Sequence, residues 1–140
     1  MIGLVDLEVG NLASLSSAML KLNIKHKICK NSFDFEGVDK IILPGVGAFQ
    51  NFKQKLKEKK FDKIIINKIN KKIPFLGICV GFQILFTQSS EHELSKGLGL
   101  INDEIVSLKS FYENLDIPHV GWNECSIIKE NKLFYKIKNN

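Results

Sequence analysis

Apolar positions along the chain alternate between short continuous runs and helical spacing. The continuous runs predict buried strands, and apolar residues recurring every three or four positions predict helices. Residues 12–22 show the helical pattern best, with an apolar stripe and with Asn11 as a candidate N-cap. The predicted strands are residues 2–7, a segment containing His26, Ile28 and Cys29, then 40–43, ended by Pro44-Gly45, and 75–79. The other predicted helices are 49–56, 61–73 and 81–86.

Strands that alternate with helices predict a parallel α/β sheet with helices on both faces. The pattern changes after Ser89, where residues 104–108 and 120–128 read as added antiparallel strands. No repeat or linker interrupts the sequence, so residues 1–140 are interpreted as one domain.

Composition fits a soluble globular protein, with 44% hydrophobic and 25% charged residues. No apolar stretch is long enough to cross a bilayer, and no secretory signal is apparent. Three cysteines without a Cys-x-x-Cys pair fit a reducing compartment and argue against a zinc site. We therefore expect a cytoplasmic protein without a metal site.

The net charge of +5 raises the question of nucleic-acid binding. Every basic residue is lysine, and arginine, the preferred partner of guanine edges and phosphates, is absent. The densest run of lysines, residues 53–63, has helical spacing and is typical of a solvated helix face. Nucleic acid and membrane are therefore not expected partners.

The sequence Gly77-Ile78-Cys79-Val80-Gly81 lies between a predicted strand and a predicted helix. A nucleophile flanked by glycines in this way occupies a sharp, strained turn at a helix N-terminus, which favours a thiolate. The alternative is a buried structural cysteine with incidental glycines.

A second glycine-rich segment, residues 44–49 (Pro-Gly-Val-Gly-Ala-Phe), directly follows another predicted strand. Glycines leave backbone N–H groups uncovered, and such groups can stabilise an oxyanion. The alternative is an ordinary strand-to-helix turn.

With Gln83 two residues after Gly81, the motif becomes Gly-x-Cys-x-Gly-x-Gln and resembles the nucleophile turn of class I glutamine amidotransferases. The resemblance implies a flavodoxin-like three-layer fold with a mostly parallel sheet. It also implies Cys79 as nucleophile, the Val80 N–H as an oxyanion donor and Gln83 as a substrate contact. Without Cys79, Gln83 would be read as a solvent-facing helix residue.

Further segments resemble one subgroup, the glutaminase subunit of imidazole glycerol phosphate synthase. There, residues 44–49 correspond to an oxyanion segment, with Val46 and Gly47 as the carried-over positions, and Glu91 corresponds to an acidic residue near bound glutamine. Residues 6–14 match the subgroup's opening, residues 97–101 match a later landmark, and Pro118-His-Val-Gly-Trp-Asn123 matches another. Asn11, Trp122 and Asn123 are the implied partner contacts, although Trp122 could also be a core aromatic.

The resemblance implies hydrolysis of glutamine to glutamate, with the ammonia passed to a (β/α)8 barrel synthase in histidine biosynthesis. It implies no metal or organic cofactor. One alternative is a paralogue that delivers ammonia to another acceptor, such as a modified sugar. Another is a non-catalytic regulatory subunit; an unrelated thiol hydrolase would not explain residues 118–123.

The family's His-x-Glu motif, which completes the catalytic triad, has no counterpart here. The three histidines are His26, His92 and His119, and none begins such a motif. We expect the chain to be a C-terminally incomplete domain, inactive and marginally stable by itself. The alternative is a degenerate paralogue that retained the fold.

Overall fold

The computed structural model describes residues 1–112, 114 and 116–137, which fall into two compact units. Unit 1 comprises Met1–Ser107, and unit 2 begins at Leu108. Every α-helix and β-strand of the described residues belongs to unit 1. The described part of unit 2 contains the short 3-10 helices Leu108–Ser110 (η2) and Lys132–Phe134 (η3).

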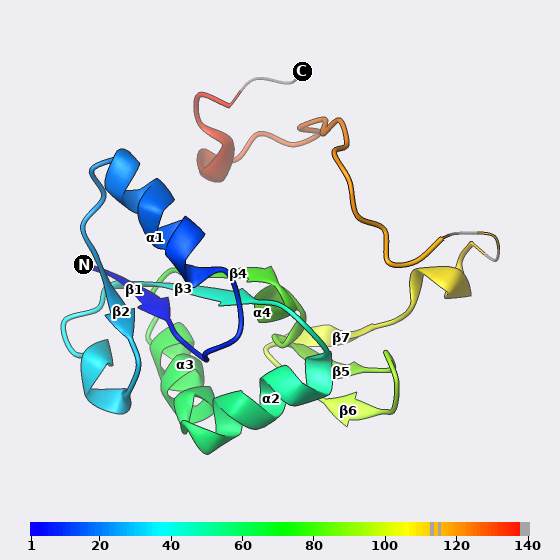
Figure 1. Ribbon diagram of the computed structural model, residues 1–140, viewed down its shortest axis with the longest axis horizontal. Coiled ribbons are helices and arrows are strands. Elements are labelled where there is room, and N and C mark those ends of the chain that lie inside the picture. Colours follow the sequence, from blue (N-terminus) through cyan, green and yellow to red (C-terminus); the bar gives the residue numbers. More distant parts are fainter. Residues whose placement is uncertain (113, 115, 138–140) are drawn as a thin grey trace. The chain divides into compact units, whose positions relative to one another are not determined.

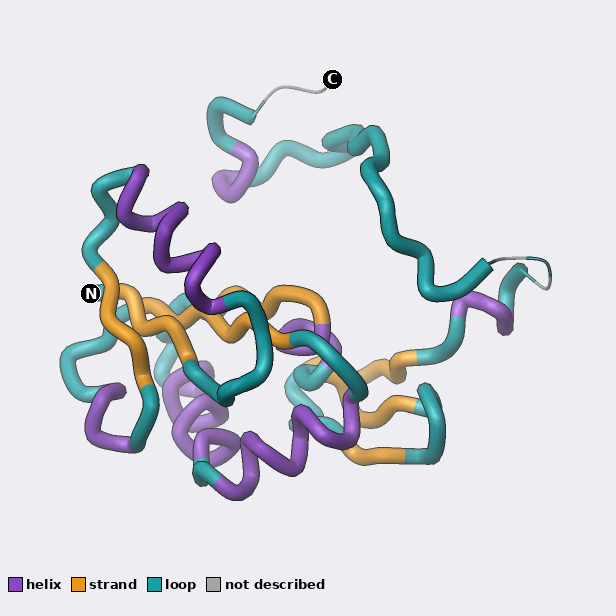
Figure 2. The backbone as a smooth tube through the Cα atoms, in the orientation of Figure 1, coloured by secondary structure: helices purple, strands orange, loops and turns teal. Residues whose placement is uncertain are grey.

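Unit 1 is built on a four-stranded parallel sheet in the order β2-β1-β3-β4 (Figure 1). Helix α1 lies on one face of this sheet, and α2 and α3 lie on the other (Figures 1 and 2). The α/β architecture with helices on both faces is therefore confirmed. The strands are β1 (Ile2–Val5), β2 (His26–Cys29), β3 (Lys40–Gly45) and β4 (Phe75–Cys79), and the helices are α1 (Leu12–Lys21), α2 (Phe49–Glu58) and α3 (Phe61–Asn70).

The main hydrophobic core involves one face of the sheet together with α2 and α3. Helical spacing brings the buried residues of α2 onto one side, and exposed polar residues such as Asn51 and Glu58 occupy the other. This core contains Val5, Leu7, Cys29, Phe35, Val38, Ile41, Leu43, Phe49, Phe52, Leu56, Phe61, Ile65, Val80 and Ile84.

Strand β3 continues through Pro44-Gly45, contrary to the prediction that this pair ends it. Pairing with β1 stops at Ile42, whereas pairing with β4 continues to Gly45. Beyond Ile42 the strand therefore bonds on one side only, where a residue without an N–H is tolerated.

A second sheet of three strands, in the order β6-β5-β7, follows the one-turn helix α4 (Val80–Gln83). The predicted helix 81–86 is thus too long, because Ile84 and Leu85 accept backbone hydrogen bonds from Leu98 and Leu100 instead (2.8 Å each). The strands are β5 (Phe86–Ser89), β6 (Ser95–Lys96) and β7 (Ile101–Ile105).

The prediction of two antiparallel strands after Ser89 is largely wrong. Strand β7 begins earlier than the predicted 104–108 and pairs in parallel with β5, while the short β6 supplies the antiparallel pairing. Residues 120–128 form no strand, because the described residues of unit 2 offer no strand to accept their backbone hydrogen bonds.

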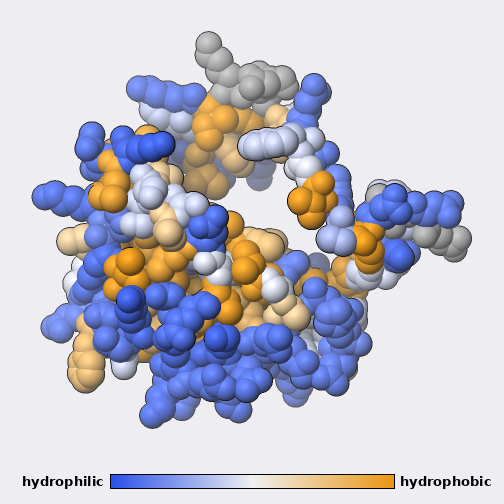
Figure 3. Space-filling model, viewed as in Figure 1, coloured by the Kyte–Doolittle hydropathy of each residue, from blue (hydrophilic) through white to orange (hydrophobic). Residues whose placement is uncertain are grey.

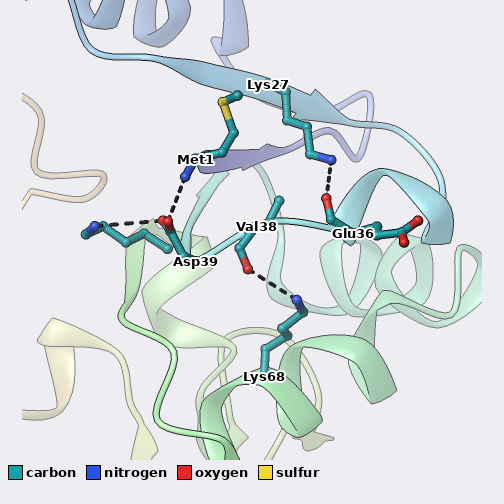
Figure 4. A network of polar contacts seen from close by, with 7 residues as sticks. Met1, Lys27, Glu36, Val38, Asp39 and Lys68 are labelled. Carbon is teal, nitrogen blue, oxygen red and sulfur yellow. Dashed lines mark hydrogen bonds and ion pairs between the residues drawn. The ribbon is translucent and has the colours of Figure 1, made fainter.

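Polar contacts hold together the amino-terminal ends of the parallel strands (Figure 4). The Met1 amine donates to Asp39 (2.8 Å), and this bond is the first cause of the lowered pKa of Asp39. From α3, the Lys68 ammonium donates to the carbonyl oxygens of Phe35 (3.0 Å) and Val38 (3.2 Å), while Lys27 donates to the Glu36 carbonyl. The 3-10 helix Ser32–Phe35 (η1) is thereby tied to β2 and α3.

The sheet face on the α1 side is only partly covered. The strand register aligns Ile28, Leu4, Ile42 and Leu76 in one row across the sheet, so their side chains share a face. Leu4 is fully buried, yet Ile28 and Leu76 are 38% and 41% exposed. Apolar surface gathers around the middle of unit 1, whereas α2 presents a hydrophilic rim (Figure 3).

Among the described residues, no helix combines the length and apolar character that crossing a bilayer requires.

We expect this partly covered face to promote self-association. Replacing Ile28 and Leu76 together by Thr, whose β-branched side chain favours strands, should shift sedimentation of residues 1–140 toward monomer. Phe33→Thr is the matched control, because Phe33 is 85% exposed on η1 and lies outside the sheet. Equal association of all three proteins would contradict this role of the face.

Candidate active site

Cys79 occupies a sharp turn between the end of β4 and the start of α4. Its backbone angles, φ 54° and ψ −121°, lie where residues with a Cβ are rarely found. The side chain is exposed. The strained turn predicted for the nucleophile is therefore present in the structure.

Glycines make this turn possible because the backbone segments around it approach closely. A Cβ at position 77 would lie 2.5 Å from the Cα of Phe82, and one at position 81 would overlap the carbonyl oxygen of Leu43. A Cβ at position 45 would lie 2.8 Å from the backbone nitrogen of Gly81. Strands β3 and β4 and helix α4 can meet here only without these side chains.

The segment Val46-Gly47-Ala48, the oxyanion loop by its predicted role, begins directly beside Cys79. Gly45 and Cys79 are register partners at the carboxyl ends of β3 and β4. Gly47 has φ +93°, which glycine adopts without strain, and the Val46 side chain is 53% exposed. Val80 is the first residue of α4, so its N–H has no acceptor within that helix. The sheet thus brings the predicted oxyanion residues to the same edge as Cys79.

Of the two predicted substrate contacts, Gln83 ends α4 and is partly buried, and Glu91 lies in the loop after β5. The Glu91 carboxylate accepts a hydrogen bond from the backbone N–H of Phe49 (2.9 Å), the first residue of α2. Sequence reasoning missed this contact, since its partners are 42 residues apart and no local pattern links them.

The predicted partner contacts fall in both units. Asn11 is the N-cap of α1, as predicted, and accepts from the Ser14 N–H (3.2 Å). A Cβ added at its neighbour Gly10 would lie 3.9 Å from the backbone of Pro44 and Gly45, next to the oxyanion loop. In unit 2, Trp122 is fully exposed, not a core aromatic within that unit, and the Asn123 amide lies 3.5 Å from the His119 ring.

Comparison with known proteins assigns the chain to a protein family. The family model described as glutamine amidotransferase class-I matches residues 3–140. The chain belongs to this family. The resemblance seen in the motifs is therefore confirmed.

Similar proteins narrow the assignment within the class I amidotransferases. The chain is 44% identical over 138 residues to imidazole glycerol phosphate synthase subunit HisH of Pyrococcus furiosus, covering 99% of this chain and 66% of that protein. HisH of Methanocaldococcus jannaschii is 42% identical over the whole chain, which spans 68% of it, and HisH 1 of Campylobacter jejuni is 39% identical. The chain thus spans about two thirds of the length of these relatives.

A solved structure supports the amidotransferase fold. A crystal structure described as a glutamine amidotransferase superimposes with a TM-score of 0.64 at 19% identity, covering 75% of this chain and 55% of the other. At this identity the likeness concerns the fold alone.

In unit 1 of this amidotransferase chain, neither described histidine is hydrogen-bonded to Cys79. His26 in β2 contacts the Ser16 hydroxyl (2.7 Å) and the Ile24 carbonyl (3.0 Å). His92 lies in the exposed loop after β5, and His119 lies in unit 2. Within the described residues of unit 1, the candidate site therefore comprises Cys79, the oxyanion loop and the two candidate substrate contacts.

The other thiols of the amidotransferase differ from Cys79 in their surroundings. Burial raises the pKa of the Cys29 thiol to about 11, and its Sγ donates to the Asp34 carbonyl (3.4 Å). Cys125 is exposed in unit 2. Among the described residues, no three His, Cys, Asp or Glu side chains are grouped to hold a metal ion.

We expect iodoacetamide at neutral pH to alkylate Cys79 and Cys125 but not Cys29. The pKa of Cys29 is raised from 9.0 to about 11, so its thiolate fraction at neutral pH is about a hundredfold lower than that of a thiol with the ordinary pKa. Its side chain is buried as well. Peptide mapping by mass spectrometry after a short pulse measures each site. Alkylation of Cys29 as fast as Cys79 in the folded protein would contradict the difference in environment.

Gly81→Ala should disrupt the turn, because the added methyl group would overlap the Leu43 carbonyl. We expect the free energy of unfolding to fall by about 3 kcal/mol, measured by urea denaturation. Gly121→Ala is the matched control and should have little effect, because a methyl group added there would meet no heavy atom within 4 Å. Equal stability of the two variants would show that α4 can shift away from β3.

Proposed function

We propose that this chain carries the nucleophile and oxyanion parts of a glutaminase site in an imidazole glycerol phosphate synthase subunit. The observation that carries the proposal is the pairing of Gly45 with Cys79, which sets the oxyanion loop beside a strained, exposed thiol. The relatives that share about 40% of its residues are named as subunits of that synthase.

The proposed reaction begins when the Cys79 thiolate attacks the side-chain carboxamide carbon of glutamine. A carbon–sulfur bond forms, and negative charge develops on the carboxamide oxygen. Backbone N–H groups of Val80 and of the oxyanion loop at Val46 and Gly47 are the proposed donors to this oxygen. The carbon–nitrogen bond then breaks, and ammonia leaves after gaining a proton.

Water completes the reaction by attacking the glutamyl thioester, which releases glutamate and restores the thiol. Both stages need a group that accepts and returns a proton. In the class I family a His-x-Glu pair supplies it, and residues 1–140 contain no His-x-Glu sequence. Turnover is therefore proposed only for a protein in which this pair accompanies residues 1–140.

Substrate recognition is assigned to Gln83 and Glu91. An ionised carboxylate suits the α-ammonium group that distinguishes glutamine from a simple amide, and the amide of Gln83 can both donate and accept hydrogen bonds. We assign ammonia delivery to a (β/α)8 barrel synthase, contacted through Asn11, Trp122 and Asn123. The protein would act in the cytoplasm, in histidine biosynthesis, and the proposed reaction uses no cofactor.

An electrophilic glutamine analogue tests the site directly. We expect it to modify Cys79 and not Cys125, and free glutamine should slow the modification because both occupy one site. The Cys79→Ala variant should lose both modification and any glutaminase activity, yet keep its affinity for the barrel synthase. Modification of Cys79 and Cys125 at the same rate, unaffected by glutamine, would refute the assignment.

A further inference from the structure

The oxyanion loop is a short exposed segment held between two buried residues. Gly45 precedes it in β3, and Phe49, which is 2% exposed, follows it as the first residue of α2. Ala48 is the N-cap of α2, and its methyl side chain cannot accept a hydrogen bond from the helix. The end of the loop therefore lacks a local cap.

Glu91 supplies this missing cap from another part of the chain. Its carboxylate Oε2 accepts from the Phe49 N–H at 2.9 Å. The Glu91 backbone N–H in turn donates to the hydroxyl of Ser89 (3.2 Å), which is 1% exposed at the end of β5. The buried end of β5 is thus linked through Glu91 to the residue that ends the oxyanion loop.

The contact with Phe49 uses only one of the two carboxylate oxygens of Glu91. A carboxylate can accept several hydrogen bonds at once, and the Glu91 side chain is exposed. One oxygen can therefore hold Phe49 while the other meets a cationic ligand group, without either contact being broken.

We propose that Glu91 is a positioning residue that couples substrate recognition to the oxyanion loop. In the bound state its Oε2 keeps the Phe49 N–H while Oε1 contacts the ammonium group of glutamine. This inference rests on the proposed function, in which Glu91 contacts the substrate, and adds the link from that contact to the loop.

A neighbouring carboxylate provides a matched control. Glu93 lies in the same loop and accepts a hydrogen bond from the Gln50 side chain in α2. Its partner is a side-chain amide and not a backbone N–H, so it cannot fix the end of the oxyanion loop in the same way. Replacing Glu93 by Ala removes one negative charge from this loop, as Glu91→Ala does, but leaves the hydrogen bond between Glu91 and Phe49 in place.

Amide hydrogen exchange at Phe49, followed by NMR in the protein without ligand, tests the structural half of the proposal. Glu91→Ala should raise the exchange rate of the Phe49 amide at least about tenfold, because the oxygen that accepts its hydrogen bond is removed. Glu91→Gln retains an acceptor oxygen and Glu93→Ala retains Glu91, so both should stay within about twofold of the original rate. The Ile42 and Leu43 amides report whether each variant is folded.

Glutamine itself tests the coupling in the unsubstituted protein, so the result does not depend on whether a variant folds. If Glu91 bridges, saturating glutamine leaves the Phe49 amide as protected as before. Loss of protection on binding would mean that Glu91 leaves Phe49 for the substrate, which overturns the proposal. Unchanged exchange at Phe49 in a folded Glu91→Ala variant would overturn it as well.

The electrophilic analogue separates this inference from the proposed function. Both Glu91→Ala and Glu91→Gln should slow modification of Cys79, since each removes the charge that meets the ammonium group. Only Glu91→Ala should also raise the hydrogen-exchange rate of the Phe49 amide. No glutamine-dependent modification in any protein would mean that the proposed function fails, whatever the exchange at Phe49 shows.

Discussion

Close backbone approach at three glycines is the constraint on which the candidate site depends. A side chain at Gly81 would overlap the Leu43 carbonyl, and side chains at Gly77 or Gly45 would meet the backbone of α4. Because glycine has no side chain to cause these clashes, β4 can turn directly into α4, with Cys79 at φ 54°. The same close approach pairs Cys79 with Gly45. The oxyanion loop begins at the next residue, Val46, and therefore starts beside Cys79.

Local patterns predicted this part of the molecule well, for physical reasons. The apolar run at residues 75–79 and the glycines around Cys79 act over a few residues, and β4 has the predicted bounds. The stop predicted at Pro44-Gly45 was wrong because a missing N–H ends a strand only where a neighbour needs it. Pairing with β1 has already ended at Ile42, so β3 continues to Gly45.

Contacts between distant segments could not be read from the sequence. The segment after Gln83 has apolar residues compatible with another helical turn, but Ile84 and Leu85 form a turn that accepts backbone hydrogen bonds from residues 98 and 100, and β5 follows it. Glu91 was expected near the substrate from family resemblance, and its hold on Phe49 emerged only from the fold. The expected roles of Gln83, Glu91, Asn11, Trp122 and Asn123 stay predictions, while the fold and the family are confirmed.

The central claim is that residue 79 and the oxyanion loop together form a site for the carboxamide group of glutamine. A crystal structure of the Cys79→Ala protein with glutamine would test it most directly, since this variant cannot form a thioester. We expect the carboxamide carbon beside residue 79, with its oxygen toward the backbone N–H groups of Val80 and the oxyanion loop. Glutamine bound with its carboxamide away from this edge of the sheet would contradict the claim.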